Sequence, residues 1–447
     1  MVAEGTSRIS MKLGRLNPGS RVWSVWLFLL VAIYPVPHTI ALRNLVLLVG
    51  LVGLAWHWRA TLHALSTLQR RLTWLTASVW VLVALSAWIV IHSLLIASLP
   101  TMALDRARAD WLVPLLLLAI GAIVAIWSQN GDAVRGLVIA LVFHILLVAV
   151  FQFWQWLTLG FWPFGFMPFA ERDYQSTLNG FLISLLLADR LSLLIAGSAP
   201  LKFSDAVAWS LLIFALGADI LLRARNGTAA SIALLLIAVA ILLADSRCRE
   251  RWGLRIGLAI GVALLLGGMS VRNDVRWYDF GESVVIGIRS NSQFWMTGDP
   301  KQLPSTPSGK PLEQSAYARA AWARQAVEAI AQKPLGIGYG HDAFGRAVAA
   351  RYGHKGMGSS HSSWLDIAIG IGIPGLALLL ALGIATVVAG WRRFRNYGDG
   401  CSLLLVLTVS GYSLRCLLDG HFSGWRIALF TLIVGLLIGT SAKAVNK

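Results

Sequence analysis

Charged residues are scarce in this sequence. Asp, Glu, Lys and Arg make up 13% of its 447 residues, whereas they approach about a quarter of a typical soluble domain. Hydrophobic residues reach 57% and the mean hydropathy is +0.69. This composition excludes a water-soluble enzyme and indicates that most of the chain is solvated by a lipid bilayer.

Cysteine and the common cofactor motifs are also rare or missing. The three cysteines, Cys248, Cys401 and Cys416, show no CxxC spacing, so the sequence predicts neither a disulfide framework nor a metal cluster. It contains no HExxH, P-loop or GxSxG motif, and no acidic pair suited to a divalent metal on the predicted outer side. We therefore expect chemistry without ATP, zinc, Mg²⁺ or another cofactor.

Acidic residues are outnumbered by basic ones, 21 to 38. In a soluble protein the resulting net charge of +17 would suggest nucleic acid as a partner. Here many of the basic residues lie in short loops between apolar runs, where they set the orientation of membrane helices. The charge therefore predicts a membrane topology and no nucleic-acid partner.

Apolar runs long enough to cross a hydrocarbon core of about 30 Å recur along the chain. Since no small-residue cleavage site follows the first run, we expect it to remain as a helix. The fold predicted is all-α, a polytopic membrane protein of about twelve transmembrane helices. The runs are 22–37, 41–58, 73–97, 110–127, 135–157, 177–196, 206–222, 228–245, 253–270, 362–390, 401–417 and 425–441.

The distribution of basic residues predicts the orientation of these helices. With the N-terminus inside, the basic segments SRCRERWGLR (246–255) and WRRFRN (391–396) both face the cytoplasm, as the positive-inside rule requires. Both termini are then cytoplasmic, and the long polar segment lies outside. We expect helices 1–9 in residues 1–270, a large extracytoplasmic loop in 271–361, and helices 10–12 in 362–447.

The large loop has features of its own. Its segments 312–332 and 341–353 follow an amphipathic helical pattern, and GIGYG (336–340) forms the turn between them. The loop carries 11 Lys and Arg against 7 Asp and Glu. An anionic ligand at this face is consistent with that balance.

Four arginines are candidates for binding such a ligand. Arg223 and Arg225 end one predicted span directly before the next begins. Snorkelling explains Arg223, whereas Arg225, at a helix start that itself favours anions, is predicted to bind one. Arg319 on the loop helix fits a solvated charged face by geometry alone, and Arg172 in FAERDY has acidic neighbours.

His361 occupies the point where the loop re-enters the membrane. A neutral imidazole can accept a proton near pH 7, although a lone interfacial histidine is as often structural. Asp366 could orient it, but the offset of five residues is awkward for one helix. The run from Gly370 to Gly375, with Gly372 and Pro374 inside it, predicts a break or close packing early in this span.

Three segments together resemble the O-antigen ligase/polymerase superfamily: Arg-Asn-Gly at 225–227, ARAAWARQAVEAIAQKPLGIGYGHDAF at 318–344, and HSSWLDIAIGIGIPG at 361–375. In that family an Arg-x-Gly follows a span, an Arg precedes an amphipathic helix ending in Pro-x-Gly-x-Gly, and a His-x-x-x-Leu opens the next span. ERDYQSTLNGF (171–181) is similar to the family's earlier outer loop.

The resemblance implies a metal-independent, inverting glycosyltransferase with a GT-C-like fold. It would move a glycan from undecaprenyl diphosphate to a sugar hydroxyl at the periplasmic face of the bacterial inner membrane. By the same resemblance, Arg225 and Arg319 hold the donor diphosphate, Arg172 is a third candidate, and His361 activates the acceptor hydroxyl. His361 could instead only bind the diphosphate, because no carboxylate base is evident.

Several activities share these motifs. The first hypothesis is an O-antigen ligase, which joins undecaprenyl-diphosphate-linked O-antigen to lipid A-core oligosaccharide, because there is one large loop rather than two comparable ones. The alternatives are an O-antigen polymerase and a protein-O-oligosaccharyltransferase. A lipid-linked oligosaccharide flippase is disfavoured, since the candidate residues gather at the outer edge, with Asp189 and Arg190 the main exceptions.

Overall fold

The computed structural model describes residues 20–128, 132–160, 172–244, 252–310, 312–354 and 357–443. Within these ranges the chain forms helices and no strand, which confirms the all-α prediction. The longer helices are α2 (Ser20–Ile33), α3 (Ile40–Trp56), α4 (Trp58–Arg71), α5 (Thr76–Leu95), α7 (Val113–Trp127), α8 (Asp132–Leu159), α9 (Arg172–Ala196), α10 (Asp205–Leu221), α11 (Arg225–Ala244), α12 (Trp252–Asn273), α15 (Gln314–Gln332), α17 (Ser363–Tyr397), α18 (Gly400–Leu418) and α19 (Gly424–Lys443).

Each of the twelve predicted apolar runs falls on one of these helices. Eight helical stretches in the described residues are long and apolar enough to cross a membrane, and three more apolar helices are shorter. The chain is therefore a multi-pass membrane protein. The segment between the second and third predicted spans, expected to be an inside loop, instead forms α4, which carries its basic residues Arg59, Arg70 and Arg71. α4 continues through a 3₁₀ turn (Leu72–Leu75) into α5.

The bundle is held by close helix contacts, of which α7 with α19 is the most extensive. Gly435 and Gly439 form a GxxxG pair on α19, and a Cβ added to them would meet Leu118 O at 2.0 Å and Ala122 O at 2.3 Å. Small residues at this spacing allow two helix backbones to approach closely in a membrane. α17 packs on both α18 and α5, and α18 packs on α9.

Helix α17 is broken near its N-terminal end, as its sequence predicted. Gly372 has φ +75°, a conformation that glycine adopts without steric cost, and Pro374 follows. The segment after α15 satisfies the freed backbone groups, since Ile337 N donates to Ile369 O and Ile373 N donates to Pro334 O. The Pro-Leu-Gly-Ile-Gly turn is thereby fixed beside the start of α17, which is where His361 lies.

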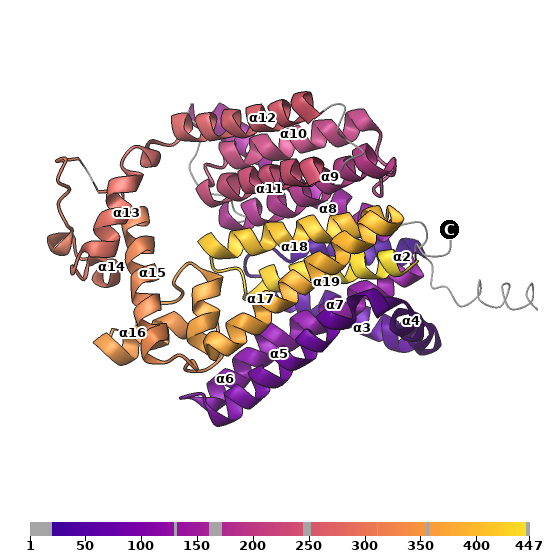
Figure 1. Ribbon diagram of the computed structural model, residues 1–447, viewed down its shortest axis with the longest axis horizontal. Helices are drawn as coiled ribbons and strands as arrows, with labels where there is room; N and C mark the ends of the chain where they lie inside the picture. The colour runs from indigo at the N-terminus through magenta and orange to yellow at the C-terminus, as the bar shows by residue number, and fades with distance from the viewer. Residues whose placement is uncertain are drawn as a thin grey trace, which may run out of the picture.

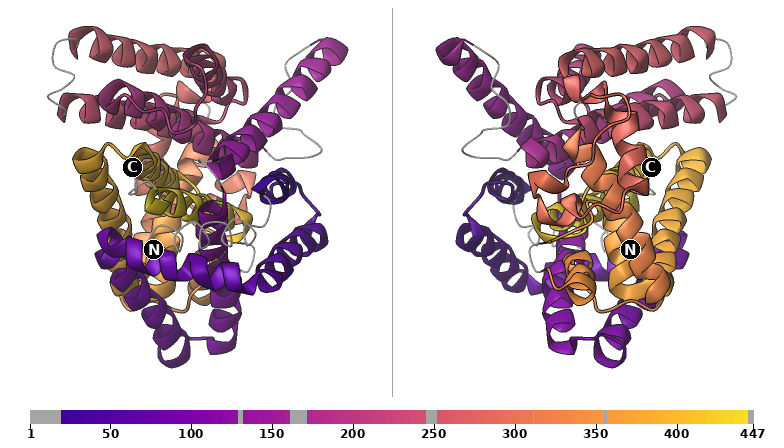
Figure 2. Two further views of the ribbon diagram at one scale, coloured as in Figure 1. Left: turned by 90° about the vertical axis from the view of Figure 1, so that its right-hand side faces the viewer. Right: turned by 90° about the vertical axis from the view of Figure 1, so that its left-hand side faces the viewer.

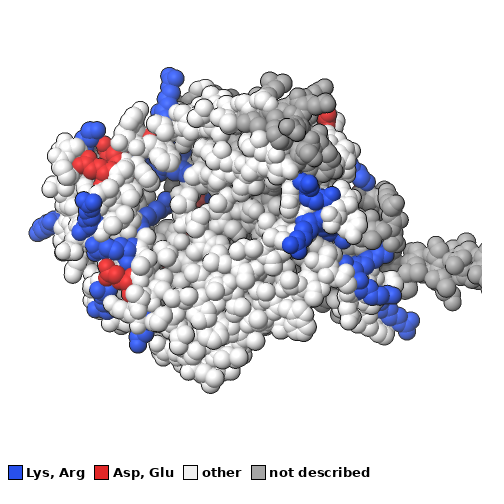
Figure 3. All heavy atoms as spheres, in the orientation of Figure 1, with Lys and Arg blue, Asp and Glu red and all other residues white. Residues whose placement is uncertain are grey.

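Four helices form a layer at one end of the bundle, opposite the C-terminus (Figures 1 and 2). They are α13 (Phe280–Arg289), α14 (Phe294–Thr297), α15 and α16 (Ala343–Tyr352). The two amphipathic helices expected in the large loop are thus present as α15 and α16. Figure 3 shows Lys and Arg at both ends of the molecule with an uncharged band between them, as expected of helices that cross a bilayer.

Candidate active site

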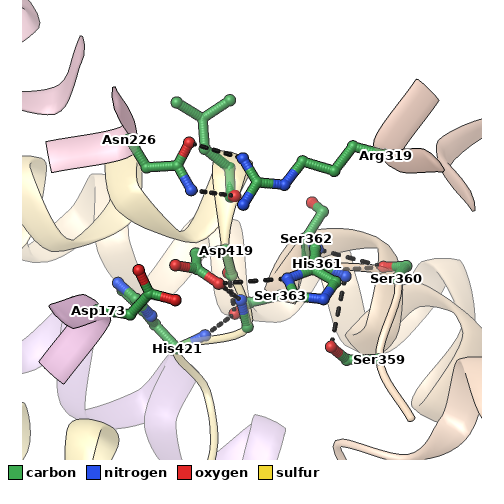
Figure 4. A network of polar contacts seen from close by, with 12 residues as sticks. Asp173, Asn226, Arg319, Ser359, Ser360, His361, Ser362, Ser363, Asp419 and His421 are labelled. Carbon is green, nitrogen blue, oxygen red and sulfur yellow. Dashed lines mark hydrogen bonds and ion pairs between the residues drawn. The ribbon is translucent and has the colours of Figure 1, made fainter. Parts of the chain in front are cut away.

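Three of the four residues to which the family resemblance assigns a role lie at the end of the bundle that carries the helical layer. Arg225 begins α11, Arg319 lies on α15, and His361 precedes α17. The fourth, Arg172, is the first residue of α9, and its side chain lies outside the described residues. Figure 4 shows the polar network around Arg319 and His361.

The arginines line one small polar pocket, here called the arginine pocket. Five arginines line it, and Asp173 is the single acidic residue among the lining residues. A diphosphate carries multiple negative charges, and guanidinium groups bind phosphate oxygens in bidentate fashion. The full lining is Asp173, Ser176, Arg223, Ala224, Arg225, Asn226, Gly227, Arg276, Ser315, Arg319 and Arg415.

Arg225 is held in place by a largely buried ion pair. Its Nη2 lies 3.1 Å from Oε1 of Glu313 and 3.3 Å from the Ser315 hydroxyl. The guanidinium also lies 5.8 Å from the ring centroids of Trp277 and Phe280. A phosphate that enters the pocket would therefore compete with Glu313 for this cation.

Arg319 reaches across from α15 to the start of α11. Its Nη1 donates to Oδ1 of Asn226 at 2.9 Å, and Nδ2 of Asn226 donates to Leu418 O at 3.1 Å. Burial lowers the pKa of the Arg319 guanidinium from its usual value, while Asp419 acts in the other direction. An arginine remains protonated at neutral pH, so the hydrogen bonds that join α11, α15 and α18 begin at a positively charged side chain.

Gly227 explains the glycine of the Arg-Asn-Gly segment. A Cβ added there would lie 2.1 Å from Oγ of Ser176 and 2.7 Å from Oδ1 of Asp219. Asp219 is buried and accepts hydrogen bonds from Ser176 and Ser231. Only a residue without a side chain lets α11 begin this close to α9 and α10, and that position delivers Arg225 into the pocket.

His361 has the geometry of an oriented imidazole. Its backbone φ is +56°, a left-handed conformation that is uncommon outside glycine. Its Nδ1 lies 3.6 Å from Oδ1 of Asp419, and the side chain is 40% exposed. The ring stacks on Trp322 with centroids 4.9 Å apart. These contacts fix the ring and leave Nε2 as the nitrogen available to a substrate.

Asp419 is the partner that sequence reasoning did not find. It ends α18, its side chain is 7% exposed, and its main-chain oxygen accepts the Ser363 hydroxyl at 2.9 Å. Burial favours a higher pKa of its carboxyl, but the contact with His361 and nearby basic side chains outweigh burial, so the pKa lies well below its ordinary value. Asp366, considered as the orienting carboxylate, instead accepts the Ser360 amide.

A second histidine lies on the other side of Asp419, fully buried. Nε2 of His421 accepts a hydrogen bond from Nε of Arg415 at 3.0 Å, and Arg415 also donates to Ser176 O at 2.9 Å. Burial, followed by the charge of Arg415, lowers the pKa of His421 well below its usual value. This neutral imidazole positions Arg415 in the arginine pocket.

The arrangement joins an anion site to an imidazole–carboxylate pair. Within the described ranges, no group of three or more His, Cys, Asp or Glu side chains is placed to hold a metal ion. The guanidinium groups of the arginine pocket lie close to His361 and Asp419, since Arg319 and Arg415 both interact electrostatically with Asp419. Such a site can neutralise a leaving diphosphate while a histidine accepts a proton.

Comparison with known proteins points to one family. No curated protein matches the chain. Residues 210–380 match the family described as O-Antigen ligase, and this segment contains Arg225, Arg319 and His361 together with the whole helical layer. Over residues 210–380 the chain is therefore similar to the O-antigen ligase family.

Proposed function

We propose that the protein is an O-antigen ligase, which transfers O-antigen polysaccharide from undecaprenyl diphosphate to lipid A-core oligosaccharide. The observation that carries this proposal is the contact of two sites, the arginine pocket and the His361–Asp419 pair, beneath α15. A lipid-linked diphosphate donor needs the first site, and a hydroxyl nucleophile needs the second.

The donor would bind with its diphosphate among Arg225, Arg319 and Arg415. As the bond between the sugar C1 and the phosphate oxygen breaks, its electron pair goes to the diphosphate, whose negative charge grows. Fixed guanidinium groups bind that charge more strongly than they bind the ground state, which lowers the barrier. Loss of one such donor costs about 3 kcal/mol, or roughly a hundredfold in rate.

The acceptor hydroxyl would attack C1 from the face opposite the diphosphate, which inverts the anomeric configuration. The new bond joins the acceptor oxygen to C1, and the hydroxyl proton passes to Nε2 of His361. The Asp419 carboxylate, 3.6 Å from Nδ1, stabilises the imidazolium that forms. Inverting sugar transfer usually requires a carboxylate. Here the carboxylate of Asp419 would act through His361 and would not itself contact the reacting hydroxyl.

The position in the cell follows from the same proposal. We place the protein in the bacterial inner membrane with both termini in the cytoplasm and the site facing the periplasm. The helical layer lies opposite the C-terminus (Figure 1), and WRRFRN at the far end of α17 suits a cytoplasmic loop. The arginine pocket then meets lipid-linked glycans at the outer leaflet.

A gene deletion tests the reaction against its alternatives. Lipopolysaccharide from the deletion strain is run on a gel, and glycan on the lipid carrier is probed separately. A ligase predicts bare lipid A-core together with long polymer on the carrier. Core that carries a single repeat would indicate a polymerase, and an unchanged ladder would contradict both and favour protein glycosylation or transport.

A further inference from the structure

A second polar cavity lies beside the His361–Asp419 pair, and none of the residues that line it lines the arginine pocket. We call it the His341 pocket; the side chains that matter here are Tyr339, His341, Ser359, Ser363, Asp366 and Arg426. Its volume is about 230 Å³, which corresponds to roughly seven or eight waters at about 30 Å³ each. That space suits one sugar unit.

His341 is held by its own buried carboxylate. Its Nδ1 lies 3.0 Å from Oδ2 of Asp110, and its side chain is 41% exposed. The other carboxylate oxygen of Asp110 accepts the Gly424 amide at 3.0 Å. Asp110 lies in a π-helical turn, Arg108–Leu112, and such turns are frequent at functional sites. The ring is therefore oriented in advance, with Nε2 free to meet a ligand.

The His341 pocket and the His361–Asp419 pair share one set of loop residues. Ser359 accepts the His361 amide at 3.4 Å and also lines the pocket. Ser363 donates to Asp419 O and lines the pocket as well. Gly420 borders the pocket directly after Asp419. A molecule in this cavity would thus lie next to the candidate base.

The chemistry of the pocket differs from that of the arginine pocket. One arginine, Arg426, and one carboxylic acid, Asp366, line it, whereas five arginines and one aspartate line the arginine pocket. Nη1 of Arg426 donates to Gly420 O at 2.9 Å, while its Nε is buried without a hydrogen-bond partner. A lining that balances one cation against one carboxylate, with hydroxyl and imidazole groups beside them, suits a neutral, hydroxyl-rich ligand better than a phosphate.

We propose that the His341 pocket binds the terminal sugar of the acceptor, with His341 and Asp110 as a specificity-determining pair. The inference rests on the proposed glycosyl transfer and adds the place of the second substrate. The acceptor sugar would then lie beside the His361–Asp419 pair, in a cavity that shares no lining residue with the arginine pocket.

The test is steady-state kinetics of the purified full-length protein with a lipid-linked O-antigen donor and lipid A-core as acceptor. His341→Ala and Asp110→Asn are compared with His354→Ala, a histidine that lines neither pocket. Loss of one hydrogen bond to the sugar should raise the acceptor KM about tenfold in His341→Ala. Donor KM and kcat at saturating acceptor should stay at the wild-type values, and His354→Ala should behave as wild type.

Two results would overturn the inference, namely an unchanged acceptor KM in His341→Ala or an equal rise in donor KM. If His341→Ala does not yield folded protein, His341→Phe, which keeps a planar ring and has no hydrogen-bonding group, replaces it with the same readout. Wild-type protein that transfers nothing to lipid A-core contradicts the proposed ligase activity itself. Wild-type transfer with a normal acceptor KM in the variant contradicts only the acceptor site.

Discussion

Replacing Asp419 by asparagine tests the imidazole–carboxylate pair. The substitution keeps the size of the side chain and removes its charge. Two unit charges about 4 Å apart interact by about 4 kcal/mol at an effective dielectric constant near 20. Because His361 is 40% exposed, solvent screening reduces this interaction, and about 2 kcal/mol of transition-state stabilisation remains. We expect kcat to fall roughly 30-fold.

The assay is transfer of glycan to lipid A-core by purified protein at saturating donor and acceptor, with Asp419→Asn measured beside His361→Ala and the double variant. If the carboxylate acts through the imidazole, the two substitutions are not additive. The double variant should then be no slower than His361→Ala alone. Donor KM in Asp419→Asn should change little, because Asp419 does not line the arginine pocket.

Two outcomes would refute this reasoning. A kcat of Asp419→Asn within about twofold of wild type would mean that the 3.6 Å contact has no catalytic role. Multiplicative losses in the double variant would show that Asp419 acts independently of His361. A loss of folded protein, judged by gel filtration in detergent, is checked with Asp419→Glu, which restores the charge.

Three further predictions concern the surroundings of the pair. Gly227→Ala should lower the melting temperature by several degrees in a thermal-shift assay, since its Cβ would meet Ser176 and Asp219 and overpacking costs about 1–3 kcal/mol; an unchanged melting temperature would contradict the close approach. Glu313→Gln should lower donor KM about threefold, because it removes the carboxylate that competes for Arg225. The amide oxygen of the new side chain can still cap the N-terminus of α15. A raised donor KM would mean that the ion pair is needed to present Arg225. Because the pKa of His421 is depressed, the unfolded chain binds a proton below pH 6.5 that the folded chain does not bind. The free energy of unfolding should therefore fall by about 1.4 kcal/mol per pH unit as the pH drops below about 6.5. His421→Gln should lack this dependence when unfolding is measured from pH 7 to pH 5.

The sequence alone was sufficient for the helices and for part of the site. The apolar runs fall on helices because length and hydropathy decide which segments enter a bilayer. The break in α17 followed from Gly372 and Pro374, whose backbone properties are local. Arg225, Arg319 and His361 were singled out by their positions at helix ends and by resemblance to a family, and their proposed roles remain predictions.

The residues that complete the site were not predicted, because they meet it only through space. Asp419 is 58 residues from His361 in the chain, and Trp322 is 39 residues away. The one available signal was LDGH (418–421), a pair of polar residues at the predicted outer end of a span. The pairing of His341 with Asp110 had no signal of this kind, since 231 residues separate the two.

The central claim is that these residues transfer a diphosphate-linked glycan to lipid A-core, and reconstitution tests it most directly. Wild-type protein and His361→Ala are placed in liposomes with undecaprenyl-diphosphate-linked O-antigen and lipid A-core, without added metal and with a chelator present. The account predicts ligated product from the wild type and a rate at least a hundredfold lower from the variant. Equal product from both proteins, or none from the wild type, would contradict it.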